Sequence, residues 1–288
     1  MPKVLMIGSN GALGSALVRA LKKNEGAYSF FLTSRNPLDQ ITEQLDIQDS
    51  PSLKRLIIKL MPDFIFNLAV NFSSNIESAI DINVRSSASL LEIVKENTPN
   101  CRVLLMGSAA EYGAVTPADN PVAESQPLNP VSVYGLTKSL QTQLVSYYAQ
   151  LGVNVSVCRI FNLDGPGISE SLFVGRLQKE VQEVLSGRKL HIELGSLDSI
   201  RDYINIEQAA QQIIDIALKG EAGEIYNVAS GIPVKISELL ERYLTDNNLP
   251  LAVVRSAKNL GSHVGYDVPV IYADITKIRS LTKKSKTI

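Results

Sequence analysis

Short, almost wholly apolar runs alternate with longer amphipathic stretches through the first half of the chain. The runs are rich in β-branched and aromatic residues, and their continuous hydrophobicity is typical of parallel strands that are covered on both faces. Strands are predicted at 3–7, 28–33, 63–70, 102–107 and 153–160. Between them, apolar positions recur at helical spacing, as in 12–23 and 74–97. The alternation predicts an α/β fold with a doubly wound parallel sheet.

The pattern becomes less regular after residue 162. Gly and Pro cluster in the segment that follows, at 163–167. Beyond it we predict helices at 171–186, 206–219 and 236–247 and short strands near 190–194 and 225–228. These elements indicate a Rossmann unit over 1–162, to which the chain returns near 203–229, and a smaller α/β unit over 163–288.

A glycine-rich segment, GSNGALG at 8–14, connects the first predicted strand directly to the first predicted helix. Glycine permits the tight turn and lets a pyrophosphate approach the backbone, and the helix N-terminus then faces the anion. Because the segment opens a βαβ series, the pattern predicts dinucleotide binding and not merely a turn. The residues expected to contact the dinucleotide here are Gly8, Asn10, Gly11, Ala12, Leu13 and Gly14.

The end of the second predicted strand indicates which dinucleotide binds. An NAD site usually places a carboxylate there, whereas a 2'-phosphate requires a cation. This chain has Ser34 and Arg35 and no carboxylate at that point, which favours NADP (NADPH) over NAD, although Arg35 could also be a solvated turn residue. Asp46 and Ile47 end a predicted third strand and are expected near the adenine. Asp46 could instead cap the helix that begins after 49–50.

A tyrosine and a lysine lie four residues apart in a predicted helix that is entered after Pro130, with Ser132 as N-cap. Tyr134 and Lys138 therefore lie on one face of that helix. A phenol has a pKa near 10, but a fixed ammonium beside it favours the phenolate, and such a pair can exchange a proton with a substrate. Alone, this spacing is common on surface helices. Its position after a glycine loop favours the catalytic interpretation.

Composition narrows the possible partners. The chain has 288 residues, 45% of them hydrophobic and 20% charged, and a formal net charge of -1 without long blocks of one sign, so neither a nucleic acid nor a membrane surface is expected as partner. Without a membrane-length apolar run or a signal-peptide core, the default expectation is a cytoplasmic protein. Cys101 and Cys158 lie in apolar segments, and His191 and His263 are not in ligand spacing with them, so we expect no metal site.

Six motifs in order resemble those of the extended short-chain dehydrogenase/reductase family: GSNGALG, GSAAEYG, YGLTK, RIFNLDGPG, RDYINIEQAA and GEIYNVASG. The resemblance covers most of the chain and is to the nucleotide-sugar epimerase, dehydratase and reductase branch. Within that branch, 107–113 and 223–240 are most similar to the reductases of GDP-4-keto-6-deoxy-D-mannose. The resemblance implies a smaller C-terminal substrate-binding domain. It also implies a homodimer, because 74–97 and 131–151 correspond to the dimer-forming helices of the family.

The same resemblance implies roles for individual residues. Ser108, Tyr134 and Lys138 would be catalytic: Tyr134 exchanges a proton with the sugar oxygen, Ser108 holds that oxygen, and Lys138 holds the nicotinamide ribose and lowers the tyrosine pKa. Asn162 and Arg201 fall where the family binds the sugar nucleotide, although Arg201 could instead form an ion pair with Asp202. Further cofactor-binding positions are Leu68, Ala69, Val70, Phe161 and Asn83, the last of which could also be a plain polar residue on a half-buried helix.

The segment GSAAEYG indicates which reaction the site can run. Dehydratases of the family carry acidic catalytic residues immediately after the Ser or Thr, and this chain has Ala109 and Ala110 there. Glu111 lies one position further on, where the most similar reductases also carry glutamate. The resemblance therefore implies hydride transfer at a carbonyl and no elimination of water.

We expect NADPH-dependent reduction of the 4-keto group of a nucleotide-linked 4-keto-6-deoxy sugar. One alternative is a nucleotide-sugar 4-epimerase with a retained NAD, against which Arg35 argues. Another is a dinucleotide sensor without catalysis, which would have no use for the Tyr134–Lys138 pair.

Overall fold

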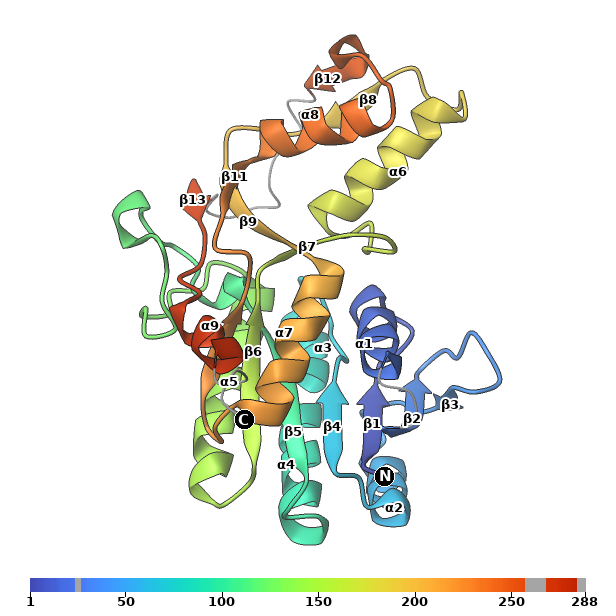
Figure 1. Ribbon diagram of the computed structural model, residues 1–288, viewed down its shortest axis with the longest axis vertical. Helices are drawn as coiled ribbons and strands as arrows, with labels where there is room; N and C mark the ends of the chain where they lie inside the picture. Colours follow the sequence, from blue (N-terminus) through green and yellow to red (C-terminus); the bar gives the residue numbers. More distant parts are fainter. Residues whose placement is uncertain (24–26, 257–267, 284–288) are drawn as a thin grey trace.

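A wholly parallel sheet of seven strands lies at the centre of the larger part of the molecule (Figure 1). The computed structural model describes residues 1–23, 27–256 and 268–283. The strand order is β10-β6-β5-β4-β1-β2-β3, which confirms the predicted doubly wound α/β fold. The strands are β1 (Lys3–Ile7), β2 (Ser29–Ser34), β3 (Glu43–Gln44), β4 (Phe64–Asn67), β5 (Arg102–Ser108), β6 (Val155–Ile160) and β10 (Ile225–Val228).

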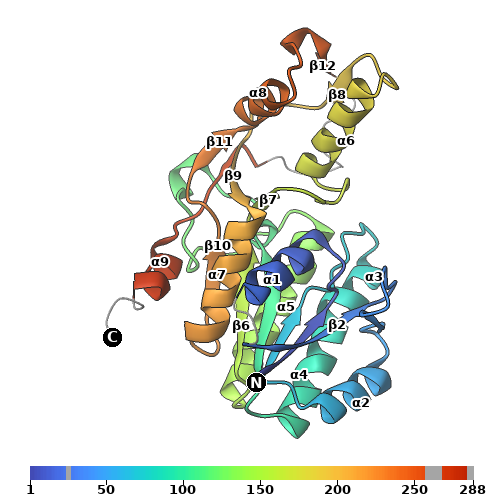
Figure 2. The ribbon, with the colours of Figure 1, turned by 45° about the vertical axis from the view of Figure 1, so that its right-hand side comes forward.

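Helices cover both faces of this sheet (Figure 2). One face carries α1 (Ala12–Lys22) and α7 (Ile206–Lys219), and the other carries α2 (Ser50–Leu60), α4 (Ser86–Asn97) and α5 (Val133–Gln150). Because side chains alternate along a strand, Met6 and Phe66 pack toward the first face, while Leu5 and Ile65 pack toward the second. Both faces are thus buried, as the continuous apolar strands predicted.

Local hydrogen bonds explain where two helices begin. Ser132 is the N-cap of α5, where its side chain accepts a hydrogen bond of 3.0 Å from Gly135 N, as predicted. Asp49 caps α2 by accepting a hydrogen bond from Ser52 N. Asp46 therefore does not cap this helix; its carboxylate accepts a hydrogen bond from Gln48 N instead.

The predicted helical stretch 74–97 forms as three consecutive pieces: α3 (Ile76–Ile80), a π-helical turn (Asp81–Arg85) and α4. π-Helical turns are rare and often lie at functional sites. This one carries the fully buried Asn83 toward α5, so the irregular turn determines what this asparagine contacts.

A second, smaller unit lies beyond the carboxyl ends of the sheet strands (Figures 1 and 2). In one of its sheets β9 (Ile200–Asn205) pairs with three other strands, and in a second β8 (Ile192–Leu194) pairs with β12 (Val254–Ser256). Leu177, Ile192 and Leu240 belong to its separate core. Its other elements are β7 (Asn162–Asp164), α6 (Phe173–Leu185), β11 (Pro233–Lys235), α8 (Ile236–Asp246) and β13 (Val270–Ile271).

The end of the described chain returns to the larger unit. After β13, helix α9 (Thr276–Lys283) packs beside α7 and β10 (Figure 1). Short 3-10 turns complete the structure at Ala109–Glu111, Pro117–Asp119 and Leu251–Val253. The first of these turns follows β5 directly and carries the segment that the sequence marked as chemically decisive.

Candidate active site

The loop between β1 and α1 forms a cradle at the carboxyl edge of the sheet. Gly8 adopts φ +82°, and a Cβ on it would lie 3.2 Å from Ala69 N and from Leu68 C, so this turn requires glycine. Helix α1 begins after Gly11 with no side-chain cap and no acidic residue in its first turn. Its first N–H groups are therefore available to an anion, and the residues present fit a dinucleotide pyrophosphate.

The turn after β2 is ordered by hydrogen bonds. Asn10 Nδ2 donates to Asn36 O at 2.9 Å, and Asn36 N donates to Ser34 Oγ at 3.3 Å. Gln44 Nε2 donates to the Arg35 carbonyl at 3.2 Å, and the Arg35 side chain is exposed. The glycine loop and the Ser34–Arg35 turn are thus neighbours. Such an arrangement can present a guanidinium to a ribose 2'-phosphate.

The other predicted cofactor residues differ in accessibility. Val70, in the loop after β4, is exposed, and Asp46 is half-buried, whereas Ile47 is buried against α2. Phe161 is only 4% exposed, and its ring packs 6.1 Å, centroid to centroid, from that of Tyr112. The structure therefore places Phe161 in the core behind the site, and its contact with a cofactor stays a prediction.

Ser108 and Tyr134 meet where β5 ends and α5 begins, near enough for the Ser108 hydroxyl to lower the pKa of the Tyr134 phenol. The approach depends on Gly135, because a Cβ there would lie 2.3 Å from the Ala110 carbonyl oxygen. The ring of Phe72, which is 41% exposed, lies 4.8 Å from that of Tyr134, centroid to centroid. A hydroxyl, a phenol and an aromatic wall thus lie at the same edge of the sheet as the cradle.

The protein alone shifts the pKa values of Tyr134 and Lys138 in opposite directions. Burial raises the pKa of Tyr134 to about 12, and the field of Glu111 adds to this, while the Ser108 hydrogen bond opposes it. Burial lowers the pKa of Lys138 to about 8. The lowering of the Tyr134 pKa that the family resemblance implies is therefore not produced by the protein alone, because desolvation of the phenolate dominates.

Lys138 is 1% exposed, and its ammonium donates to Met106 O at 2.8 Å and to Gln141 Oε1 at 2.9 Å. An ammonium has three N–H donors, so one more hydrogen bond can be made to a ribose hydroxyl. The position of Lys138 behind Tyr134 on α5 is compatible with the implied role.

Glu111 is fully buried and serves the structure of this loop. Its carboxylate accepts hydrogen bonds from Ser108 N at 2.8 Å and Thr142 Oγ1 at 2.7 Å, and it forms an ion pair with Arg159 at 3.0 Å. Arg159 stacks over the Tyr112 ring, whose hydroxyl donates to Asn227. We call these residues the Glu111 network: Glu111, Thr142, Arg159, Tyr112 and Asn227. With its oxygens occupied, Glu111 holds the Ser108 loop in place and is not placed to exchange protons with a substrate.

Asn83 fastens the loop after β4 to α5. Its amide donates to Thr137 Oγ1 at 2.9 Å and to Asn71 O at 3.0 Å, and it accepts a hydrogen bond from Asn71 N. The neighbouring Phe72 is thereby held over Tyr134. The placement is compatible with the supporting role that the resemblance implies, and that role stays a prediction.

Two predicted substrate residues lie on paired strands of the smaller unit. Asn162 on β7 is exposed, and its amide donates to Asp202 O at 3.0 Å; Arg201 on β9 donates from Nη1 to Ile200 O. The Asp202 carboxylate is fully buried and accepts hydrogen bonds from Ser230, Gly231 and Ala273. Asp202 therefore anchors β9 to the loop after β10.

Sequence reasoning missed several residues of this site. Ser87, Gln141 and Thr142 are buried polar residues on helices, and Gln141 and Thr142 follow Lys138 at helical spacing, a signal that could have found them. No local signal pointed to Phe72 or to Arg159, because their partners are distant along the chain.

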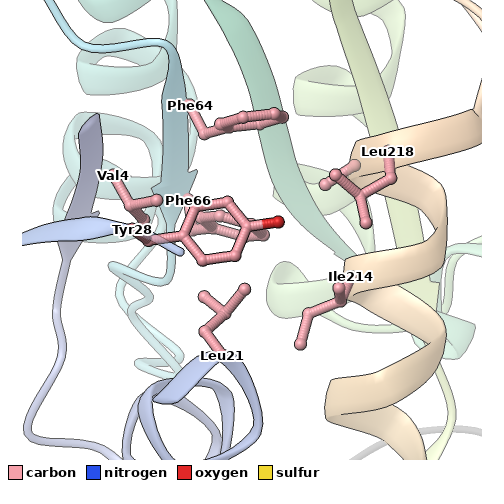
Figure 3. A pocket seen from close by; sticks show the side chains of 8 residues that line it. Val4, Leu21, Tyr28, Phe64, Phe66, Ile214 and Leu218 are labelled. Atoms are coloured by element: carbon pink, nitrogen blue, oxygen red, sulfur yellow. The ribbon is translucent and has the colours of Figure 1, made fainter. Parts of the chain in front are cut away.

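An apolar pocket lies elsewhere, between α1, α7 and the amino-terminal ends of the strands (Figure 3). Val4 and Phe64 line it at the start of β1 and β4, together with Ile214 of α7. In a parallel α/β sheet, ligands bind at the opposite, carboxyl edge. The pocket is therefore separate from the candidate site.

The described residues contain neither a candidate metal site nor a membrane-length apolar helix. Within residues 1–23, 27–256 and 268–283, no group of three or more His, Cys, Asp or Glu side chains could hold a metal ion. His263 lies outside these ranges. Over the same ranges, no helix is long and apolar enough to cross a membrane.

The chain matches one family model and is similar in sequence to several proteins of known name. The model of the NAD dependent epimerase/dehydratase family matches residues 4–229. GDP-6-deoxy-D-mannose reductase of Pseudomonas aeruginosa is 27% identical over 178 residues, which cover 61% of this chain and 59% of that protein. GDP-6-deoxy-D-talose 4-dehydrogenase of Aggregatibacter actinomycetemcomitans is 27% identical over 243 residues, or 83% of this chain and 78% of that protein.

The fold is likewise shared with solved structures. RMD from Pseudomonas aeruginosa, complexed with NADPH, superposes with a TM-score of 0.85 at 22% identity over 98% of this chain and 93% of that chain. Curated 4-epimerases and 4,6-dehydratases also match, at identities of 22% to 26%. At these identities the superposition shows only that the fold is shared. The reaction has to be inferred from the family match and from the residues of the site.

Proposed function

The chain belongs to the NAD dependent epimerase/dehydratase family, and on this premise we propose that it uses NADPH to reduce the 4-keto group of a nucleotide-linked 4-keto-6-deoxy sugar. The sequence-based assignment to NAD(P)-dependent enzymes of the extended short-chain dehydrogenase/reductase family is confirmed by the family match and the relatives. The substrate and the reaction are the proposal. Two of the relatives are named for a reductase and a dehydrogenase of 6-deoxy sugars.

The observation that carries the proposal is the approach of the Ser108 hydroxyl to the Tyr134 phenol, with alanine at 109 and 110. A phenol and a hydroxyl together can bind a carbonyl oxygen and give it a proton. The methyl groups of Ala109 and Ala110 cannot assist the elimination of water. Glu111 cannot substitute for them, because it is occupied within the Glu111 network.

Each residue of the site has its own role in the proposed reduction. A bound nicotinamide cofactor supplies the hydride to the carbonyl carbon. Ser108 donates a hydrogen bond to the carbonyl oxygen, and Tyr134 delivers the proton that completes the alcohol. The buried Lys138 ammonium stabilises the phenolate that this transfer leaves behind. Phe72 shields the reacting edge of Tyr134 from water.

Arg35 supports NADPH as the cofactor, since its exposed side chain directly follows β2, in the turn beside the glycine loop. Asn162 and Arg201 support binding of the sugar nucleotide, with the guanidinium as a donor to the diphosphate. A homodimer through α3, α4 and α5 is part of the proposal, because Ile76, Leu136 and Tyr147 expose apolar surface there. Light scattering on the purified protein checks the dimer.

The decisive test is NADPH oxidation with a panel of sugar nucleotides that includes GDP-4-keto-6-deoxy-D-mannose, with mass spectrometry of the products. We expect one hydride equivalent consumed per alcohol formed. Arg35→Ala should raise the KM for NADPH about tenfold and leave that for NADH unchanged, because only NADPH carries the 2'-phosphate. Absence of oxidation over the whole panel would overturn the proposal.

The second candidate is a 4-epimerase, favoured by the match to a protein of Methanocaldococcus jannaschii named "Putative UDP-glucose 4-epimerase", which covers 96% of this chain and 92% of that protein at 24% identity. The same Ser108 and Tyr134 would then serve a site that keeps its NAD. Purified protein that retains NAD through desalting and interconverts UDP-glucose and UDP-galactose without added cofactor would establish this function in place of the reductase.

A further inference from the structure

The buried ammonium of Lys138 is held by a chain of uncharged hydrogen-bonding groups. Lys138 Nζ donates to Gln141 Oε1 at 2.9 Å, Gln141 Nε2 donates to Ser87 Oγ at 3.0 Å, and Ser87 Oγ donates to Asn83 O at 2.9 Å. Lys138, Gln141, Ser87 and Asn83 are each at most 2% exposed. We call these four residues the Lys138 network. It links α5 to α4 and to the π-helical turn.

We propose that Gln141 is a positioning residue of the reaction: it fixes the Lys138 ammonium beside Tyr134 while leaving its positive charge unneutralised. Glutamine fits this role because it has both an acceptor and a donor. The acceptor meets the ammonium, which can only donate, and the donor meets Ser87, whose own hydrogen is used on Asn83 O.

A carboxylate at position 141 would reach as far as the amide but would change the chemistry. It could not donate to Ser87, so the Ser87 hydroxyl would have to turn away from Asn83 O. It would also place a negative charge against the ammonium in a buried site, where the charge is poorly screened. The charge of Lys138 would then act less on the phenol of Tyr134.

The elements that pack around Lys138 carry both charged and neutral groups. Behind β5, Glu111 raises the pKa of Lys138, but it is itself paired with Arg159 of β6. On the π-helical turn, Asp81 and Arg85 pair with each other at 2.7 Å. On α5 the neighbouring titratable group is Tyr134, and α4 contributes the neutral Ser87. Gln141 is therefore the direct side-chain partner of the ammonium, and it is neutral.

The test measures Lys138 directly and needs no substrate. In protein labelled with 13C-lysine, the Lys138 Cε resonance, assigned by its loss in Lys138→Met, is followed through a pH titration without cofactor. Starting from a pKa of about 8, Gln141→Glu should raise the pKa by about one unit or more, because a nearby carboxylate favours the ammonium. Gln141→Met should lower it, because the acceptor is lost.

Gln143→Glu is the matched control, because it adds the same charge on the exposed side of the same helix. There water and salt screen the carboxylate, and we expect a shift of less than about 0.3 unit. If Gln141→Glu moves Lys138 no further than Gln143→Glu does, the inference is overturned. A purely structural glutamine would change thermal stability without changing this titration.

The kinetic consequence rests on the proposed function. Gln141→Met should lower kcat about tenfold and leave the KM for the sugar nucleotide within about twofold, since it displaces a group that acts on the proton transfer. Ser87→Ala should lower kcat about threefold, and the double variant should be no slower than Gln141→Met, because both act through one chain.

The two hypotheses fail separately. An inactive protein with the expected Lys138 titration would reject the reductase and keep the Lys138–Gln141 assignment. An active reductase whose Ser87→Ala and Gln141→Met effects multiply independently, with unchanged Lys138 titrations, would keep the function and reject the positioning role. Ser87→Ala removes a single hydroxyl, and this smaller change provides a measurement if Gln141→Glu does not fold.

Discussion

Two buried polar networks meet at the end of β5, and they differ in how their charge is balanced. In the Glu111 network, the carboxylate lies 3.0 Å from the guanidinium of Arg159. In the Lys138 network, the ammonium meets only a backbone carbonyl and an amide oxygen. Glu111 and Lys138 are almost equally inaccessible to water, with 0% and 1% exposure. Burial alone therefore does not distinguish a structural charge from a chemical one.

The difference lies in what each network can do with its charge. A paired and fully hydrogen-bonded carboxylate keeps its partners in place, and removing one partner leaves the other buried without compensation. An ammonium among neutral acceptors keeps its positive charge one helical turn from the phenol of Tyr134, and its pKa falls to about 8 because the field of Glu111 offsets burial only in part. We expect the Glu111 network to control stability and the Lys138 network to control activity.

The largest expected effect is that of Tyr134→Phe, which removes the proton donor beside the Lys138 network. We expect kcat to fall by about 10³ to 10⁴ because the proton donor is lost, with the melting temperature almost unchanged because phenylalanine keeps the ring and its packing against Phe72. Steady-state kinetics and calorimetry measure the two quantities. Cofactor binding, followed by fluorescence, should stay within about twofold as the control. A fully active variant would remove Tyr134 from the mechanism.

Glu111→Gln tests the other side of the comparison. It leaves the buried Arg159 without a counter-charge, so we expect the free energy of unfolding in urea to fall by about 4 kcal/mol. The double variant Glu111→Gln with Arg159→Met should recover much of this loss, since it removes the uncompensated charge as well. A large fall in kcat at unchanged stability would instead mean that Glu111 takes part in the chemistry.

The third expected effect is a dependence of the free energy of unfolding on pH, which the Lys138 network should cause. Burial lowers the pKa of Lys138 from 10.5 to about 8 in the folded protein. Between these two pH values the unfolded chain binds more protons, so stability should rise with pH there, whereas below about pH 8 the penalty is fully present. Relative to Lys138→Met, we expect wild type to gain about 3 kcal/mol over this window. The free energy of unfolding of both proteins is measured by urea titration at each pH. If wild type and Lys138→Met depend on pH in the same way, Lys138 is not a buried charge.

Thr142→Val gives the smallest expected change. Its hydroxyl donates to Glu111 at 2.7 Å, so the variant removes one hydrogen bond of the Glu111 network and leaves the ion pair intact. We expect a loss of about 1 kcal/mol in the free energy of unfolding and less than a twofold change in kcat. A tenfold loss of activity would show that the two networks are coupled through Ser108. The separation into one network for stability and one for activity would then be wrong.

Much of the fold could be predicted because its signals are local. Continuous apolar runs predicted the parallel strands, and β1, β5 and β10 form within a residue of the predicted positions. The predicted run at 63–70 was too long: β4 ends at Asn67, where the chain turns against Gly8. Hydrophobicity continues through this turn because Leu68 and Ala69 line the cradle, so a pattern of apolar residues could not mark its end.

The chain by itself determined the glycine loop, the helix that carries Tyr134 and Lys138, and the family, because each depends on residues close together in sequence. Only the tertiary structure decided what Glu111 does, since its partner Arg159 lies 48 residues away. It likewise decided that Gln141 meets Ser87, 54 residues earlier. Such contacts depend on how strands and helices pack side by side. The spacing of residues along one element does not indicate which residues of a neighbouring element they will contact.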